Sequence, residues 1–112
     1  MFILEIHRLA YEELDALPLT VRAKMILQLD KLRANPTALR EPDSKPLGNG
    51  LFEIRTVGLV HTRGIYVYRQ GRVIWLLRVF VKKTQKTPAL DIQLATNRLK
   101  EMLNEQSHSE LG

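Results

Sequence analysis

The sequence predicts a single α+β domain in which a small, twisted and mostly antiparallel sheet carries two N-terminal helices on one face. A chain of 112 residues with 45% apolar residues can build one hydrophobic core and is too short for two ordinary domains. A short apolar segment and two helical patterns come first, and three β-rich segments and a last helical pattern follow. We therefore expect the order β-α-α-β-β-β-α in one domain over residues 1–112.

The N-terminal part predicts one strand and two helices. Residues 2–6 are apolar and partly β-branched, which favours a strand, and residues 8–17 carry apolar residues near helical spacing. A second helix follows, and its apolar stripe at steps of four, four and three consists of Val21, Met25, Leu29 and Leu32. Asn35-Pro36 ends this helix. Residues 35–50 are rich in proline and glycine and predict one long connecting loop.

Three strands are predicted next. Residues 51–57 alternate in hydrophobicity, residues 63–69 are rich in β-branched and aromatic side chains, and residues 72–81 form a nearly continuous apolar run. A run of this kind is typical of a central strand that is covered on both faces. Gln70-Gly71 predicts a tight hairpin between the last two strands.

The last element is a helix with a clear start signal. Thr87 suits the N-cap and Pro88 suits the first helical position. An apolar stripe continues from there to about Glu105. We expect residues 106–112 to form a frayed tail.

Basic residues concentrate in one stretch of the chain. Residues 45–88 contain nine Lys/Arg and one acid, Glu53, which gives +8 (nine minus one), whereas residues 1–44 contain six basic and seven acidic residues. Such a local concentration is typical of a polyanion-binding surface, because each cation that meets a phosphate releases condensed counterions. The chain has no cysteine, no signal-peptide pattern and no apolar run of membrane length, so we expect a cytoplasmic protein without disulfides.

Three arginines are candidates for anion binding. Arg55 and Arg63 flank a short loop between neighbouring predicted strands, so antiparallel pairing should bring their guanidinium groups together. A phosphate between them would relieve the repulsion, because arginine presents a planar fork to phosphate oxygens. Arg78 lies within the apolar run, where it would bind an anion, pair with Glu53 or extend to the rim of the sheet.

The histidines and acids do not predict a metal site. His61 is the only histidine near the basic stretch, His7 and His108 are distant in sequence, and no carboxylate cluster accompanies them. Templates for a serine nucleophile, a P-loop or a dinucleotide site are also absent. Aromatic residues on the predicted strands fit either core packing or the stacking of nucleobases.

Three motifs stand in a fixed order along the second half of the chain. Residues 47–55 read LGNGLFEIR, residues 63–66 read RGIY, and residues 76–88 read LLRVFVKKTQKTP. This set resembles the phage-derived, HigB-like branch of the RelE/ParE toxin superfamily, and FVKKTQKTP is its most specific part. The resemblance covers nearly the whole chain and implies a RelE-like fold.

The resemblance also implies an activity. Members of this superfamily are toxins of type II toxin–antitoxin systems, and most cleave ribosome-bound mRNA without a metal or other cofactor, through attack of the ribose 2′-OH on its own phosphate. Arg55, Arg63 and Lys82 match positions at which relatives bind and polarise that phosphate. The chain lacks the C-terminal Tyr or His that many relatives use as acid or base, so Lys82 or His61 would take this role. We expect further substrate contacts from Arg78, Lys83, Lys86 and Arg69.

The implied partners are mRNA, the ribosome and a cognate antitoxin of the HigA-like helix-turn-helix kind. We expect no membrane contact and only indirect contact with DNA, through the antitoxin. Two alternatives stay open: a non-catalytic, ParE-like inhibitor of DNA gyrase and a plain nucleic-acid-binding module. The concentrated basic residues favour a nuclease over a gyrase inhibitor, whereas no residue pattern separates the nuclease from the binding module.

Overall fold

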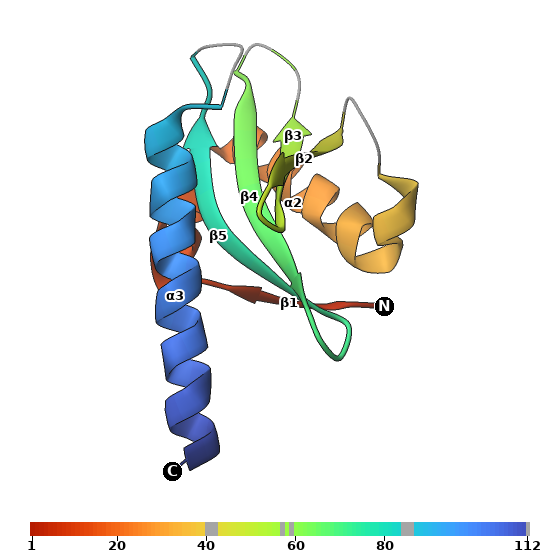
Figure 1. Cartoon of the computed structure of the whole chain (residues 1–112). Coiled ribbons are helices and arrows are strands. Elements are labelled where there is room, and N and C mark those ends of the chain that lie inside the picture. The colour runs from red at the N-terminus through yellow and green to blue at the C-terminus, as the bar shows by residue number, and fades with distance from the viewer. Residues whose placement is uncertain (40–42, 57, 59, 84–86, 112) are drawn as a thin grey trace.

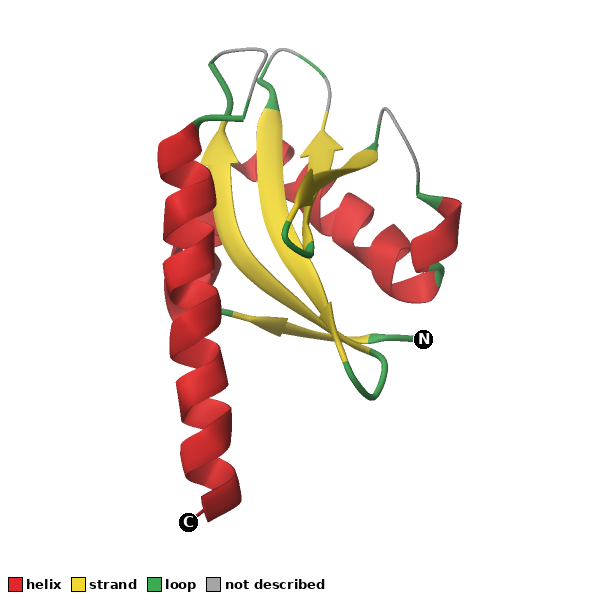
Figure 2. Ribbon diagram, in the orientation of Figure 1, coloured by secondary structure: helices red, strands yellow, loops and turns green. Residues whose placement is uncertain are grey.

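The computed structural model describes the whole chain except residues 40–42, 57, 59, 84–86 and 112. The elements are β1 Ile3–Ile6, α1 Arg8–Asp15, α2 Leu19–Ala34, the 3₁₀ turn η1 Pro36–Ala38, β2 Ser44–Gly48, β3 Leu51–Thr56, β4 Thr62–Arg69, β5 Val73–Val81 and α3 Ala89–Leu111. The five strands form one sheet in the order β1-β5-β4-β3-β2 (Figures 1 and 2). β1 runs parallel to β5, and the other neighbouring pairs are antiparallel. The predicted α+β class and mostly antiparallel sheet are confirmed.

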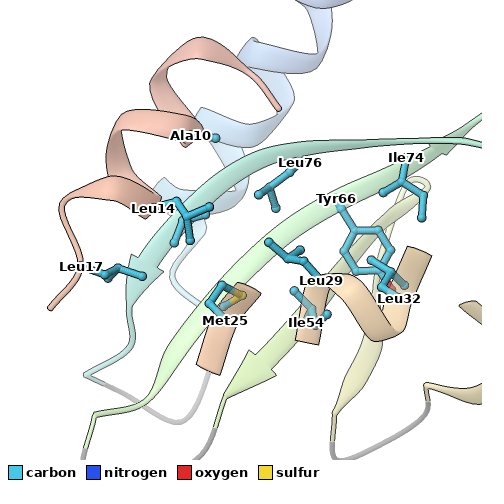
Figure 3. Packing of buried hydrophobic residues seen from close by; sticks show 11 residues of the cluster. Ala10, Leu14, Leu17, Met25, Leu29, Leu32, Ile54, Tyr66, Ile74 and Leu76 are labelled. Carbon is cyan, nitrogen blue, oxygen red and sulfur yellow. The ribbon is translucent and has the colours of Figure 1, made fainter. Parts of the chain in front are cut away.

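Helices cover both faces of the sheet. α1 and α2 pack on one face, as predicted, and bury the core shown in Figure 3. Met25, Leu29 and Leu32 of the predicted α2 stripe are buried against Ile54 and Tyr66 of the sheet. α3 packs on the opposite face, where Ala95 belongs to a second core. This second core consists of Leu51, Ile65, Val67, Trp75, Leu77, Phe80 and Ala95.

The apolar run of the sequence forms β5, which lies between β1 and β4 in the sheet. α1 packs against β5 on one face and α3 packs against it on the other. The prediction of a central strand covered on both faces is therefore confirmed. A bulge interrupts its pairing with β4, because Ile65 lies opposite Arg78 while the next residue, Tyr66, lies opposite Leu76.

Two elements differ from the sequence prediction. Residues 35–50, predicted as one loop, contain η1 and the edge strand β2, which pairs with β3. Pro46 obscured the strand pattern, and an edge strand tolerates proline because one side of its backbone needs no partner strand. Asn49 connects β2 to β3 with a positive φ of 54°. The last helix was also predicted too short, since residues 106–111, expected as a frayed tail, continue α3.

β5 extends beyond the end of its partner strand β1. Side chains from α1 and α3 bind the backbone groups of β5 along this unpaired edge. Glu13 accepts a hydrogen bond from the backbone N–H of Val79 at 3.1 Å, and Arg98 donates to the carbonyl of Leu77 at 3.0 Å. Arg98 also donates to both oxygens of Glu13, at 2.8 Å each, and Arg78 pairs with the same carboxylate. Burial raises the pKa of Glu13, but the hydrogen bonds from Arg98 and Val79 and the arginine charges outweigh it, so the pKa is lowered. Such an ion network protects a strand edge that would otherwise expose unpaired backbone groups.

Glu13→Ala should therefore destabilise the fold by about 3 kcal/mol, because it leaves buried Arg98 without its carboxylate and Val79 without an acceptor. Urea unfolding at pH 7 measures this change. Glu12→Ala is the matched control, since Glu12 is the exposed neighbour on the same helix and its replacement should change stability by less than about 0.5 kcal/mol. Equal effects of the two substitutions would contradict the role of Glu13.

Candidate active site

Four basic side chains converge on the face of the sheet that carries α3. They are Lys45 of β2, Arg55 of β3, Arg63 of β4 and Lys82, which directly follows β5. Register places them together, because Lys45 lies opposite Glu53, Arg55 lies opposite Arg63, and Arg63 lies opposite Phe80 of the α3-side core. We call these four residues the basic cluster. The prediction that pairing of the strands brings Arg55 and Arg63 together is confirmed.

The carboxylate of Glu53 lies at the centre of the basic cluster and is completely buried. Its Oε1 accepts a hydrogen bond from Arg55 Nε at 3.0 Å and lies 3.4 Å from Arg63 Nε. The contact with Arg63 is a charge attraction without hydrogen-bond geometry, since Arg63 Nε has no hydrogen-bond partner among the described residues. Arg63 is held instead by donation from Nη1 to the carbonyls of Thr56 at 3.4 Å and Thr62 at 3.1 Å.

Glu53 also ties the start of α3 to the sheet. The hydroxyl of Thr87 donates to Glu53 Oε2. Burial raises the pKa of Glu53, but hydrogen bonds from Thr87 and Arg55 and the charges of Lys82 and Arg55 outweigh it, so its pKa lies below the ordinary value. Thr87 was predicted as the N-cap of the last helix. Its hydroxyl donates a hydrogen bond to Glu53 instead, and the helix begins at Ala89.

Lys82 is a buried lysine among other cations. Only 8% of its surface is exposed. Burial lowers the pKa of Lys82, the charges of Arg63, Arg55 and Lys45 lower it further, and the opposing attraction of Glu53 does not restore it. A lysine in this environment releases its proton more readily than a solvated lysine, as proton-transfer chemistry requires.

His61 lies beside Lys82 along the sheet, because the carbonyl of His61 accepts a hydrogen bond from the backbone N–H of Lys82 at 2.7 Å. His61 is exposed, in contrast to the buried residue Lys82. Lys83 is exposed next to Lys82. Lys86, predicted to contact substrate, lies outside the described residues.

Two arginines predicted to bind substrate lie in other surroundings. Arg78 pairs with Glu13 and with Asp91 at 2.9 Å rather than with Glu53, so its charge belongs to the network that joins α1, β5 and α3. Arg69 lies at the other end of β4 from Arg63, six residues or about 20 Å away. Neither arginine therefore belongs to the basic cluster.

Arg69 has its own partners at that end of the sheet. Its guanidinium carbon lies 4.7 Å from the centroid of the Trp75 ring, and its Nη2 donates to Gln106 at 3.2 Å. Trp75 Nε1 in turn donates to Glu5 at 2.9 Å. Arg69 therefore helps to attach α3 to the hairpin between β4 and β5.

Sequence reasoning missed Lys45, which lies in the segment predicted as a loop, and the central position of Glu53. One signal pointed to Glu53, because it is the single acid among the nine basic residues of its stretch. It also stands two residues from Arg55 on a strand, and residues at this spacing share a face.

The described part of the chain contains no group of three His, Asp or Glu residues that could hold a metal ion. His7 has a structural position: its Nδ1 accepts a hydrogen bond from the backbone N–H of Leu9 at 3.0 Å at the start of α1, and its Nε2 lies 3.0 Å from Glu101 Oε2 of α3. No helix among the described residues has the length and hydrophobicity required to cross a membrane.

Comparison with known proteins identifies the family. Residues 12–100 match the phage-derived protein Gp49-like family. The chain belongs to this Gp49-like family. No curated protein matches its sequence.

Solved structures show that this Gp49-like protein has the fold of RelE. A free E. coli RelE toxin with two arginines replaced by alanine superposes with a TM-score of 0.66 at 18% identity, over 87% of this chain and 96% of that chain. RelE in the intact E. coli RelBE toxin–antitoxin complex gives 0.62 at 18% identity, over 75% and 100%. The RelBE2 complex of Mycobacterium tuberculosis gives 0.57 at 21% identity, over 72% and 98%. The RelE-like fold that the sequence motifs implied is confirmed.

The buried charge of Glu53 gives a pH-dependent prediction. Because the folded-state pKa is lowered, Glu53 stabilises the Gp49-like protein above its unfolded-state pKa of about 4.3, and this contribution disappears as the pH falls through the folded-state value. Glu53→Gln should lower the free energy of unfolding by about 3 kcal/mol at pH 7 and by progressively less below pH ~4. Urea unfolding of both proteins from pH 7 to 3 measures the difference. The exposed-site substitution Glu12→Gln should show no such pH-dependent loss, and a constant loss for Glu53→Gln would contradict the argument.

Proposed function

We propose that this protein is the toxin of a type II toxin–antitoxin system and cleaves mRNA without a metal ion. The observation that supports this most directly is the convergence of Lys45, Arg55, Arg63 and Lys82 around one buried carboxylate. Four cations and one carboxylate give the site a charge of +3, which suits a phosphate. The solved toxins with the same fold favour a toxin over a general nucleic-acid-binding module.

The members of the basic cluster differ in their access to a phosphate. The Arg55 side chain is 21% exposed and Lys45 is half-buried, so these two meet the RNA first. Arg63 is buried and held by backbone carbonyls. Its fixed charge stabilises the negative charge that grows on the phosphorane, because preorganised cations are most effective where water is excluded.

The reaction requires two proton transfers. The 2′-OH loses its proton and attacks the adjacent phosphorus, the bond from phosphorus to O5′ breaks, and O5′ gains a proton; the products are a 2′,3′-cyclic phosphate and a 5′-OH. We assign one of these transfers to Lys82, because its lowered pKa suits acid–base chemistry and its charge lies within the basic cluster. His61 is the alternative proton-transfer group.

The biological setting is part of the same proposal. The protein belongs to the HigB-like branch, acts in the cytoplasm on ribosome-bound mRNA and is held inactive by a HigA-like antitoxin. Two of the solved structures with this fold are toxin–antitoxin complexes, which supports an antitoxin as the natural partner. A positively charged cluster favours an antitoxin with acidic groups on its contact surface.

Arg55→Ala and Lys82→Ala should each reduce transcript cleavage by about 10²-fold or more while the protein stays folded, because a positioned cation contributes at least that factor to the stabilisation of a transition state. Induction in bacteria followed by mapping of transcript 5′ ends measures this, and the new ends should carry a 5′-OH. Lys31→Ala is the control, since it removes the same charge from an exposed position on α2. Growth arrest without transcript cuts in the Arg55/Lys82 double variant would favour a gyrase inhibitor instead.

Lys82→Arg separates charge from proton transfer. Arginine keeps the positive charge but does not release a proton near neutral pH, so RNA binding should be retained while the single-turnover cleavage rate falls nearly as far as in Lys82→Ala. His61→Ala should leave the rate within about threefold if Lys82 transfers the proton. A fully active Lys82→Arg protein together with an inactive His61→Ala protein would transfer the role to His61.

A further inference from the structure

A cavity of about 510 Å³ opens near the free edge of the sheet, beside the edge strand β2. Four aromatic residues line it: Phe2, Phe52, Tyr66 and Tyr68. Pro46 and Lys45 of β2 also line it. Phe52 and Tyr66 pack with the α1/α2 core, so the cavity lies on the face of the sheet opposite Glu53.

The rings form one connected aromatic wall. Phe52 stacks on Tyr66 with centroids 5.6 Å apart and an interplanar angle of 22°, and Tyr68 meets Phe52 edge-on at 5.2 Å. Phe2 meets Tyr68 edge-on at 6.2 Å. Tyr66 is fixed at the base by a 2.8 Å hydrogen bond to Ser44, whereas Tyr68 is 38% exposed and forms the accessible part of the wall. Fixed, partly exposed rings are the structural requirement for stacking a planar ligand.

Lys45 connects this cavity to the basic cluster. It lines the cavity, and its charge also contributes to the lowered pKa of Lys82. The Cα atoms of Lys45 and Glu53 are partners in neighbouring strands, about 5 Å apart. The aromatic cavity and the basic cluster therefore lie on opposite faces of the sheet and both reach its edge strand β2.

We propose that this cavity binds a nucleobase of the RNA strand whose phosphates meet the basic cluster. The inference rests on the proposed function. The strand crosses the edge at β2, with one phosphate on Arg55 and the base of a nucleotide further along the strand against Tyr68 and Phe52, because Tyr68 lies five residues, about 17 Å, along β4 from Arg63, the partner of Arg55. The cavity would thereby influence which nucleotide lies a few positions from the cleaved bond.

The lining favours a base over an aliphatic side chain of a protein partner. Stacked and edge-on rings offer flat surfaces, which match the π-face of a base. The charge of Lys45, on the basic-cluster side of the edge strand β2, suits the phosphates that accompany every base.

Equilibrium binding to 2′-O-methyl RNA heptamers tests the proposal, because this RNA has no 2′-OH and is not cleaved. Replacing one base at a time by an abasic site should weaken binding at one position by about 5- to 100-fold. Tyr68→Leu should weaken binding of the intact RNA by a similar factor and should remove the penalty of that abasic site, since the two changes delete the same contact. Tyr11→Leu is the matched control, because Tyr11 is 60% exposed on α1 and outside the cavity lining, and it should bind as the native protein does.

Photo-crosslinking locates the base without a cavity variant. RNA with 5-iodouridine at the sensitive position should crosslink to Tyr68 or Phe52 of the native protein. Crosslinks confined to other residues, or an unchanged abasic penalty in folded Tyr68→Leu, would overturn the cavity proposal. If Arg55→Ala still abolishes RNA binding in that case, the proposed function stands and only the cavity assignment fails. Native protein that neither binds RNA nor cuts transcripts would instead overturn the proposed function.

Discussion

One buried carboxylate makes the basic cluster possible. Glu53 has no exposed surface and lies among the four cations of the basic cluster, with Arg55 at 3.0 Å and Arg63 at 3.4 Å. Buried like charges repel strongly unless an opposite charge lies between them. Glu53 supplies that charge and also accepts the hydroxyl of Thr87, so one side chain holds the arginines together and fixes the start of α3 beside them. The geometry of the site and the placement of the last helix therefore depend on the same residue.

A second ion network solves a different problem in the fold. β1 pairs with only the first part of β5, and the remaining edge of β5 would expose backbone groups between two helices. Glu13 and Arg98 bind those groups, and Arg78 joins them instead of the basic cluster. The cations of the most basic stretch of the sequence thus have two different functions. Some of its cations join helices to the sheet, whereas Lys45, Arg55, Arg63 and Lys82 keep a net positive site around Glu53.

The periodic parts of the fold were predictable because burial leaves a direct pattern in the sequence. The stripe of α2 and the apolar run of β5 appear where expected, and the pairing of Arg55 with Arg63 follows from two strands joined by a short loop. β2 was missed because Pro46 and Gly48 give an edge strand the composition of a loop. Glu53 was the one carboxylate considered for Arg78, because its actual partners Glu13 and Asp91 are distant in sequence and meet it only through tertiary packing.

The same interactions impose opposite demands on stability and on phosphate binding. A carboxylate that offsets the cations stabilises the fold, but it also reduces the attraction that an incoming phosphate experiences. The geometry reconciles these demands by placing Glu53 beneath the surface, against Arg55 Nε, while the Arg55 side chain remains 21% exposed. Arg55 can therefore be held by one part of its guanidinium group and offer the rest to the substrate. Lys82 is subject to a related balance: Glu53 raises its pKa while burial and three neighbouring cations lower it, so the carboxylate that assembles the site also limits how readily Lys82 releases a proton.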